Sequence, residues 1–395
     1  MYLDTHNYAD CSGCSACESI CSKKAISFSE LHNGFYYPVI DSTKCVKCNL
    51  CRSVCAFNKI IDRNDEPVIY YGWNTNEITR LFSTSGGAFY ALAECFIKKH
   101  ASESFSIYGA SWISTDKVSH VCISSINDIR RLQRSKYIQS DLCGTFQEIR
   151  AKLENGEWVM FSGTPCQVAA LNSFLGNRNR TRLLTIDLIC NGIASPVVFS
   201  DYIKELNKRS KKLIRYSFRN KNIQKQSQKY VKYEFEDGSF KYREDDLFYI
   251  AYQLRLLHRE SCFNCPYSER KHDADITLGD FWHIEEIIHE LKKERIYGIS
   301  LIMCNTEKGK DIVNNISGFN LTKTNIVPKA QRLNIKMRDS HMDLFYKNYD
   351  PELIMDNLKK YIGYKRLLRC KYYTLYNYYS HFRQIIYRGL IHGKK

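Results

Sequence analysis

The sequence lacks an apolar run of about 18 residues, the length that a helix needs to span a membrane. Its first residues, MYLDTHNYADC, lack the basic segment and apolar stretch of a secretory signal. No recognised nucleic-acid-binding motif accompanies the net charge of +16, so we expect no nucleic acid as a partner. These absences predict a cytoplasmic protein without a membrane span.

What the sequence does contain is cysteine, at 17 of its 395 positions. In a long chain without a secretory signal, so many thiols indicate metal or redox chemistry in a reducing compartment rather than disulfides. The hydrophobic content of 44% is enough for a buried core, and the length suggests two or three domains.

Eight of the cysteines form two runs near the N-terminus, both with the spacing C-x2-C-x2-C-x3-C. In this spacing, three thiolates of one run hold one [4Fe–4S] cluster and the fourth reaches the other cluster. The spacing assigns cluster 1 to Cys11, Cys14, Cys17 and Cys55. It assigns cluster 2 to Cys45, Cys48, Cys51 and Cys21.

Residues 5–58 resemble a bacterial two-cluster ferredoxin, an electron-transfer domain. Between the two runs, Gly34 at a turn and the apolar residues around it predict a short hairpin beside the clusters. Ser22 and Ala56 stand where ferredoxins usually have proline, a change that removes no ligand. A pair of zinc sites is the alternative, but zinc ligands usually come in pairs with a longer spacer.

The body of the chain alternates short apolar runs with helical patterns, which predicts a mixed α/β fold. We expect strands at 68–73, 105–112, 118–123, 158–163 and 183–190, and helices at 86–100, 164–175 and 195–206. Residues 230–243 predict a hairpin around Asp237 and Gly238. The polar segment 59–67 is an expected linker.

Two turns that lead from a strand or loop into a helix carry candidate binding residues. At 83–87, glycine and the free N–H groups of a helix start suit a phosphate or an anionic ring, although such turns more often only cap a helix. At 163–166, the turn places Cys166 in the first helical turn, where the helix dipole favours a thiolate.

Three further cysteines extend the second of these sites. Cys190 ends a buried strand, and Cys262 and Cys265 form another Cys-x2-Cys pair. With Cys166 they make four soft ligands, which fit either a third [4Fe–4S] cluster or a zinc ion.

Several short motifs occur in one order over residues 65–330. They are STSGG at 83–87, SKYIQS at 135–140, GTPCQVAAL at 163–171, DLICNG at 187–192, CFNCPY at 262–267 and DITLGDFW at 275–282. Together they resemble the beta subunit family of coenzyme F420 hydrogenase and dehydrogenase. The resemblance implies a flavin, generally FAD, beside an iron–sulfur cluster, with electron transfer between them. In archaeal members, hydride passes on to a deazaflavin coenzyme.

The resemblance implies that the flavin contacts are Thr84, Ser85, Gly86, Gly87, Lys136, Tyr137, Gln139 and Ser140. It gives the third cluster to Cys166, Cys190, Cys262 and Cys265. Lys136 is the catalytic candidate, because a positive charge at the flavin N1–C2 edge stabilises the anionic reduced ring; a surface lysine is the alternative. The family usually has His where this chain has Asn191, which cannot relay a proton near neutral pH. We expect Trp282 to lie in the core.

Half of the net charge lies in the last segment, where residues 351–395 carry ten Lys or Arg against two acids. A basic amphipathic helix there would make a peripheral contact with the inner face of the membrane or dock an acidic partner. A helix packed on the protein's own body is the alternative.

The sequence thus predicts four parts. They are a 2[4Fe–4S] ferredoxin-type domain at 1–60, the N-terminal part of a flavin-binding body at 67–145, a C-terminal body with the third cluster at 146–330, and a basic, Tyr-rich helical tail at 331–395.

The predicted function is an oxidoreductase that passes electrons between the clusters and FAD, and then to or from an organic substrate or a deazaflavin-type coenzyme. One alternative is an electron-transfer subunit that serves a partner enzyme; a weaker one is a zinc-bearing nucleic-acid binder. The expected partners are a redox protein such as a ferredoxin, a partner enzyme and an unknown small-molecule substrate.

Overall fold

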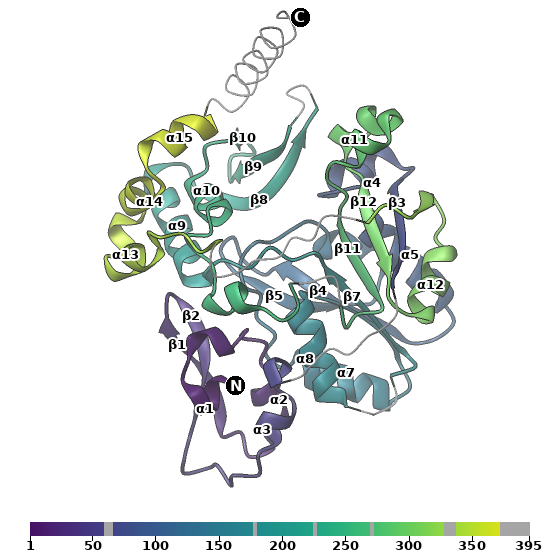
Figure 1. Cartoon of the computed structure of the whole chain (residues 1–395), viewed down its shortest axis with the longest axis horizontal. Coiled ribbons are helices and arrows are strands. Elements are labelled where there is room, and N and C mark those ends of the chain that lie inside the picture. The colour runs from purple at the N-terminus through teal and green to yellow at the C-terminus, as the bar shows by residue number, and fades with distance from the viewer. Residues whose placement is uncertain (59–65, 177–179, 224–226, 269–271, 328–336, 372–395) are drawn as a thin grey trace, which may run out of the picture.

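The computed structural model describes residues 1–58, 66–176, 180–223, 227–268, 272–327 and 337–371. Most of the expected linker, and the tail beyond Lys371, lie outside the described residues. Figure 1 shows a small N-terminal part, in purple, beside a larger body of strands and helices.

The N-terminal part is built around one hairpin. Strands β1 (Ile26–His32) and β2 (Phe35–Ile40) pair antiparallel, as the sequence predicted. The turn between them has positive φ angles at Asn33 (55°) and Gly34 (66°), which these two residue types tolerate best. The surrounding short helices are α1 (Tyr2–Thr5), α2 (Ala16–Ile20) and α3 (Leu50–Ser53), with 3-10 turns at Tyr8–Asp10 and Ala56–Asn58.

An eight-stranded sheet forms the frame of the body, in the order β13-β3-β12-β11-β7-β6-β4-β5. The strands are β3 (Val68–Asn74), β4 (Phe105–Trp112), β5 (Val118–Ile123), β6 (Trp158–Ser162), β7 (Leu183–Leu188), β11 (Ile276–Asp280), β12 (Ser300–Cys304) and β13 (Phe319–Thr324). The four central strands, β11, β7, β6 and β4, are parallel, and antiparallel strands extend both edges. The predicted mixed α/β fold is confirmed.

Helices cover both faces of this sheet. On one face lie α5 (Ala88–Lys99) and α12 (Glu307–Asn314), and on the other lie α7 (Thr145–Glu154) and α8 (Pro165–Leu175). Along β6, Met160 packs on the α5 side, whereas Val159 and Phe161 pack on the α8 side. Because side chains alternate along a strand, a strand buried on both faces is apolar throughout. The shorter helices are α4 (Glu77–Phe82), α6 (Ile129–Leu132) and α11 (Ile284–Ile287).

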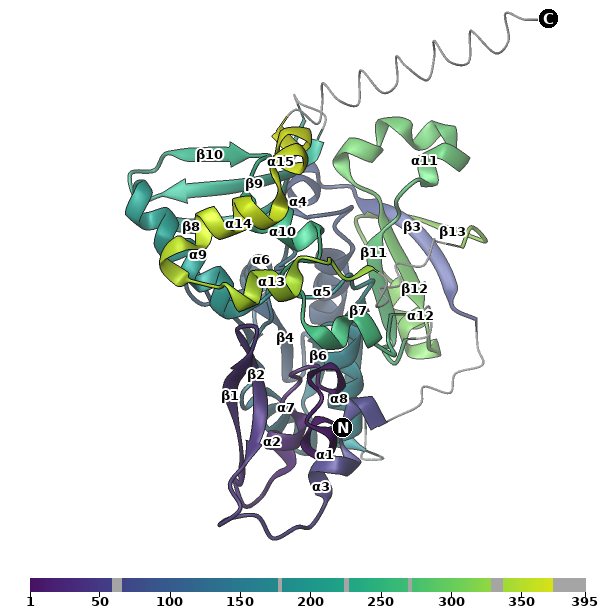
Figure 2. The ribbon, with the colours of Figure 1, turned by 60° about the vertical axis from the view of Figure 1, so that its left-hand side comes forward.

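A second, three-stranded sheet packs with the C-terminal helices (Figure 2). Its strands are β8 (Leu213–Asn222), β9 (Ser227–Phe235) and β10 (Phe240–Arg243), and its helices are α9 (Pro196–Arg209), α10 (Leu247–Gln253), α13 (Met342–Lys347), α14 (Ile354–Ile362) and α15 (Tyr364–Lys371). The predicted hairpin at 230–243 is present as β9–β10. Ile354 and Leu358 of α14 are fully buried in this core. The described part of the tail therefore packs on the body.

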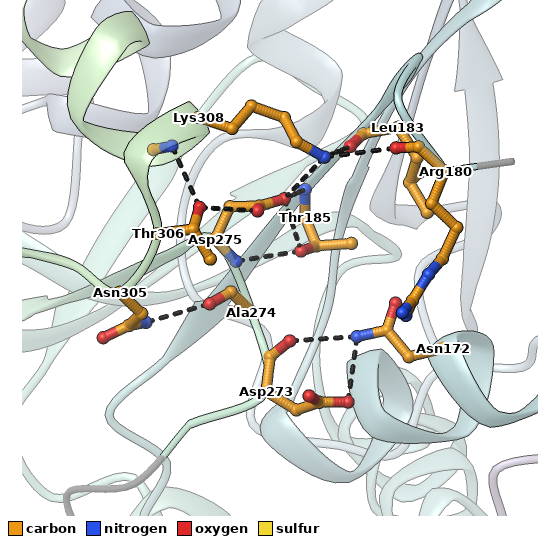
Figure 3. A network of polar contacts seen from close by, with 11 residues as sticks. Asn172, Arg180, Leu183, Thr185, Asp273, Ala274, Asp275, Asn305, Thr306 and Lys308 are labelled. Atoms are coloured by element: carbon orange, nitrogen blue, oxygen red, sulfur yellow. Dashed lines mark hydrogen bonds and ion pairs between the residues drawn. The ribbon is translucent and has the colours of Figure 1, made fainter. Parts of the chain in front are cut away.

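A polar network connects β7 and β11 near their amino-terminal ends (Figure 3). Asp275, directly before β11, accepts hydrogen bonds from the amide and hydroxyl of Thr185 at 2.9 Å each. Its other oxygen accepts from Thr306, which caps α12, at 2.7 Å. The network fixes one end of these strands, and the opposite ends lead into the cavity described below.

Candidate functional site

Four cysteines of the N-terminal part lie near one another. Burial, with a smaller contribution from charge on Cys11 and Cys55, raises the pKa of the Cys14 thiol to about 12. Burial also raises the pKa of Cys17, and Cys14, Cys11 and Cys55 add to that shift. The structure thus brings together the four residues that the spacing assigned to cluster 1, although they come from both runs.

The second run is more exposed. Burial raises the pKa of Cys51, and charge on Cys48 and Cys45 adds to the shift, so these three thiols form another group. Cys48 itself is exposed. Cys21 follows helix α2, and its sulfur accepts a hydrogen bond from the amide of Ala25 at 3.3 Å. Its membership of the second group stays a prediction.

The third group joins cysteines that are up to 99 residues apart in the sequence. Burial raises the pKa of Cys265, and the charges of Cys166, Cys262 and Cys190 raise it further. Burial raises the pKa of Cys262 to about 12. Cys166 is the second residue of α8, and Cys190 follows β7. Cys262 and Cys265 lie on and directly after a 3-10 turn (Glu260–Asn264). The fold therefore brings together the four thiols predicted for a third cluster.

The donors of the three groups are thiols, which are ligands of iron–sulfur clusters and of zinc alike. Buried thiols become good ligands only when a metal or a cation offsets the cost of their ionisation. In the described parts of the chain, no group of three or more Cys, His, Asp or Glu side chains has the arrangement of ligands around one metal ion. The spacing of the two N-terminal runs favours [4Fe–4S] clusters there, and the metal of the third group stays a prediction.

A cavity of about 630 Å³ lies against the third group. Cys166 and Cys190 form part of its wall, together with Ser12 of the N-terminal part. Most of the predicted flavin contacts also line it, namely Thr84, Ser85, Gly87, Lys136, Tyr137, Gln139 and Ser140. Its volume is typical of a small-molecule or cofactor site, which spans about 300–1,000 Å³.

Gly86 is the predicted contact that does not line this cavity. A Cβ at this position would come within 2.5 Å of the Gly72 carbonyl oxygen on β3 and 2.8 Å of the Ser300 amide nitrogen on β12. Glycine is needed here because two backbones approach closely, so Gly86 supports the turn rather than the cavity wall.

Lys136 is held in the cavity wall rather than on the open surface. Its ammonium donates hydrogen bonds to the carbonyl oxygens of Gln133 at 2.7 Å and Leu132 at 3.2 Å. Burial lowers the pKa of Lys136 to about 7, and the nearby charge of Arg134 adds to this shift. Lys136 therefore lines the cavity and is half-buried, and its catalytic role stays a prediction.

Ser140 is fixed by two neighbours. The Nε2 atom of His120 lies 3.0 Å from the Ser162 carbonyl oxygen, so it must donate there, and its Nδ1 then accepts from the Ser140 hydroxyl at 3.0 Å. Gln167 in turn donates to Ser140 at 3.0 Å. Burial lowers the pKa of His120 to about 4, so the imidazole stays neutral and keeps this tautomer.

Sequence reasoning missed a buried ion pair on the cavity wall. Arg219 donates to Asp280 at 2.6 Å and to the Tyr137 hydroxyl at 3.3 Å. Its guanidinium lies over the ring of Trp282, 5.1 Å from the centroid. Trp282 is 43% exposed and lines the cavity, so the expected core position is wrong. Asp280 lies in the DITLGDFW motif, although it was not predicted as a site residue, and no sequence signal pointed to Arg219.

A second missed residue, Arg259, joins the N-terminal part to the body. It is fully buried and donates to the carbonyl oxygens of Cys11 at 2.7 Å and Tyr36 at 3.0 Å. It also donates to Gln139 at 2.9 Å, and Gln139 donates to the Gly13 carbonyl oxygen at 3.1 Å. The cavity wall is thereby connected to the loop that carries the first cysteine run.

The two ferredoxin-type cysteine runs, together with a thiol-lined cavity on a mixed α/β body, define an iron–sulfur electron-transfer protein. Residues 10–59 match the family of the 4Fe-4S dicluster domain. Residues 156–328 match the family described as the C terminus of the coenzyme F420 hydrogenase/dehydrogenase beta subunit. The chain therefore combines a region that matches the dicluster domain with a region that matches the C terminus of that beta subunit family, and the resemblance found in the sequence is confirmed.

One similar solved structure is the F420-reducing [NiFe] hydrogenase complex from Methanosarcina barkeri. The match has 16% sequence identity and a TM-score of 0.43, and it covers 77% of this chain and 93% of the other chain. These values are too low to carry a functional conclusion. None of the curated proteins compared with this chain matches it.

Within the described residues, every helix is too short or too polar to cross a bilayer.

Proposed function

We propose that this protein is an iron–sulfur flavoprotein oxidoreductase. Electrons pass between the ferredoxin-type clusters, a third [4Fe–4S] cluster and FAD, and then to or from an organic substrate or a deazaflavin-type coenzyme. One observation carries the proposal: seven of the eight predicted flavin residues and two cysteines of the third group line the same cavity. A flavin there would convert the single electrons of clusters into the electron pairs that organic substrates accept.

The residues of the cavity wall have separate roles in this proposal. The turn at Ser85 and Gly87 lets a ligand approach backbone N–H groups, and Lys136 supplies a positive charge that is only partly present at neutral pH. Tyr137 offers a ring that stacks on Tyr252, with centroids 4.6 Å apart. Cys166 and Cys190 would hold the third cluster beside the ligand.

A second candidate function, an electron-transfer subunit for a partner enzyme, is favoured by the exposed surface of the second cysteine run. There, Val46 is 60% exposed and Leu50 is 46% exposed beside the exposed Cys48 and Lys47. Apolar and basic side chains around a cluster at the surface suit contact with a redox protein such as a ferredoxin. In either case we propose a cytoplasmic location.

The test is the content of iron, sulfide, zinc and flavin per chain after anaerobic purification. We expect about twelve iron atoms and one FAD in the wild type, and about eight iron atoms in Cys262→Ser. Cys143→Ser, which changes an exposed cysteine outside the three groups, is the matched control and should keep all twelve.

An iron content that Cys262→Ser leaves unchanged would rule out the third cluster. About eight irons together with zinc and no flavin in the wild type would rule out the flavoprotein and favour a ferredoxin domain fused to a zinc-stabilised body.

A further inference from the structure

Three arginines that line the cavity share a strained backbone. The φ angles are 72° at Arg134, 50° at Arg219 and 65° at Arg255, all in the left-handed region that favours glycine and asparagine. Arg219 lies where the pairing of β8 with β9 shifts register. Residues with a strained backbone of this kind are enriched at functional sites, where the surrounding fold holds them in that conformation.

The described residues of the cavity wall carry more positive than negative charge. Arg134, Lys136, Arg219 and Arg255 line the cavity, whereas Asp280 is the one carboxylate among the described lining residues. That carboxylate already accepts a hydrogen bond from Arg219. Gathering like charges in a partly buried wall is costly unless an anion offsets them.

Two of these arginines also present buried donors that are not used within the protein. Among the described residues, Arg219 Nη2 and Arg255 Nε are buried and have no hydrogen-bond partner. Arg219 as a whole is 8% exposed, and its other terminal nitrogen is fixed by Asp280 and Tyr137. A guanidinium that is held in place through one nitrogen and keeps another N–H without a partner is able to donate a hydrogen bond to an oxyanion.

Aromatic contacts connect the two arginines, both of which line the cavity. Arg219 reaches Tyr137, Tyr137 stacks on Tyr252, and the amide of Arg255 donates to the Tyr252 carbonyl oxygen at 2.9 Å. The ring of Trp282 lies under Arg219 and lines the same cavity. Aromatic rings beside a few charged donors in one cavity are typical of sites for organic anions.

We propose that Arg219 and Arg255 form an oxyanion subsite for the phosphate or carboxylate group of an organic molecule bound in this cavity. The proposal deepens the proposed function and rests on it for the nature of that molecule. The oxyanion belongs either to the organic substrate, which would then be an acid or a phosphate ester, or to the diphosphate of the flavin.

The experiment titrates inorganic pyrophosphate into the full-length, anaerobically purified protein by calorimetry and measures flavin per chain in the same samples. The variants are Arg255→Gln and the pair Arg219→Gln with Asp280→Asn, which removes the ion pair without leaving an unpaired acid. Arg215→Gln, an exposed arginine on the same strand β8, is the matched control. Iron per chain and circular dichroism check that each variant is folded.

If the subsite serves the substrate, we expect pyrophosphate affinity to fall at least tenfold in both variants and to stay unchanged in Arg215→Gln. If it holds the flavin diphosphate, the bound flavin closes it to pyrophosphate, and flavin content should fall in both variants but not in Arg215→Gln. Flavin content that stays at the wild-type value assigns the subsite to the substrate, and loss of flavin assigns it to the flavin diphosphate. If folded variants keep both flavin and pyrophosphate affinity, the subsite is ruled out. A wild type that binds pyrophosphate through these arginines but contains no flavin would refute the proposed function and leave the subsite intact.

Discussion

At the scale of single residues, Lys136 has the environment that bears most directly on chemistry. Its ammonium is bonded to two carbonyl oxygens, and burial lowers its pKa to about 7. The group is therefore about half protonated near neutral pH, and a bound anion would favour the charged form.

This shift predicts how stability depends on pH. Because the pKa of Lys136 is lowered in the folded protein, the unfolded chain binds more protons between about pH 7 and pH 10.5, and the folded state gains stability as the pH rises through that window. The melting temperature of the wild type, relative to that of Lys136→Met at the same pH, should therefore rise between pH 7 and pH 9.5. Lys98→Met, at an exposed site on α5, provides the baseline. A difference that does not change with pH would contradict the lowered pKa.

Sequence reasoning reached part of the site because its motifs are local. The segments 83–87 and 135–140 were located from short runs, and all but one of their named residues line the cavity. Arg219 and Arg259 were missed because their partners are distant in sequence: Asp280 lies 61 residues from Arg219, and Cys11 lies 248 residues from Arg259. A single arginine in a sequence carries no signal of which carboxylate or carbonyl oxygen it meets.

At the scale of elements, β7 and β11 position the site. Cys190 follows β7, and Asp280 ends β11, so the relative placement of the two strands decides where these side chains meet the cavity. The Asp275 network holds their opposite ends in register (Figure 3). A contact remote from the cavity thus contributes to its geometry.

We expect Asp275→Ala to lower the free energy of unfolding by about 3 kcal/mol, because it leaves the buried amide and hydroxyl of Thr185 without their charged acceptor. Urea denaturation checks this value. Asp311→Ala removes an exposed ion pair with Lys99 and should change the free energy by less than about 1 kcal/mol. Equal effects of the two substitutions would show that the network does not stabilise the strands.

Local patterns predicted individual elements better than their pairing. The expected strands at 105–112 and 118–123 coincide with β4 and β5, and the expected helix at 164–175 begins one residue before α8. β3 pairs with β12 and β13, which follow it by more than 200 residues. Such a pairing depends on the whole sheet, so no short stretch of sequence encodes it.

At the scale of the whole molecule, the C-terminal segment contains a part that belongs to the core and a basic part outside the described residues. Residues 354–362 form α14, whose buried side chains belong to the core. Residues 372–395, outside the described part, carry four Lys or Arg and no acid. A test of membrane contact must therefore remove only the residues after Lys371.

The intact protein should float with vesicles that contain anionic lipid, and a chain that ends at Lys371 should remain in the soluble fraction while keeping its melting temperature. Neutral vesicles are the control, because the attraction is electrostatic. If both chains partition equally onto anionic vesicles, the tail makes no membrane contact.

Arg259 has a further consequence for the molecule as a conductor of electrons. Its buried charge favours the ionised thiols of Cys166 and Cys262 and touches the backbone of Cys11. A cation shared by two cluster sites raises the reduction potential of both, since each reduced centre carries one more negative charge. An electron that crosses from cluster 1 to a third cluster would stay within the field of the same guanidinium. Because the junction between the two parts of the chain would raise both potentials together, the driving force between the two clusters would change little.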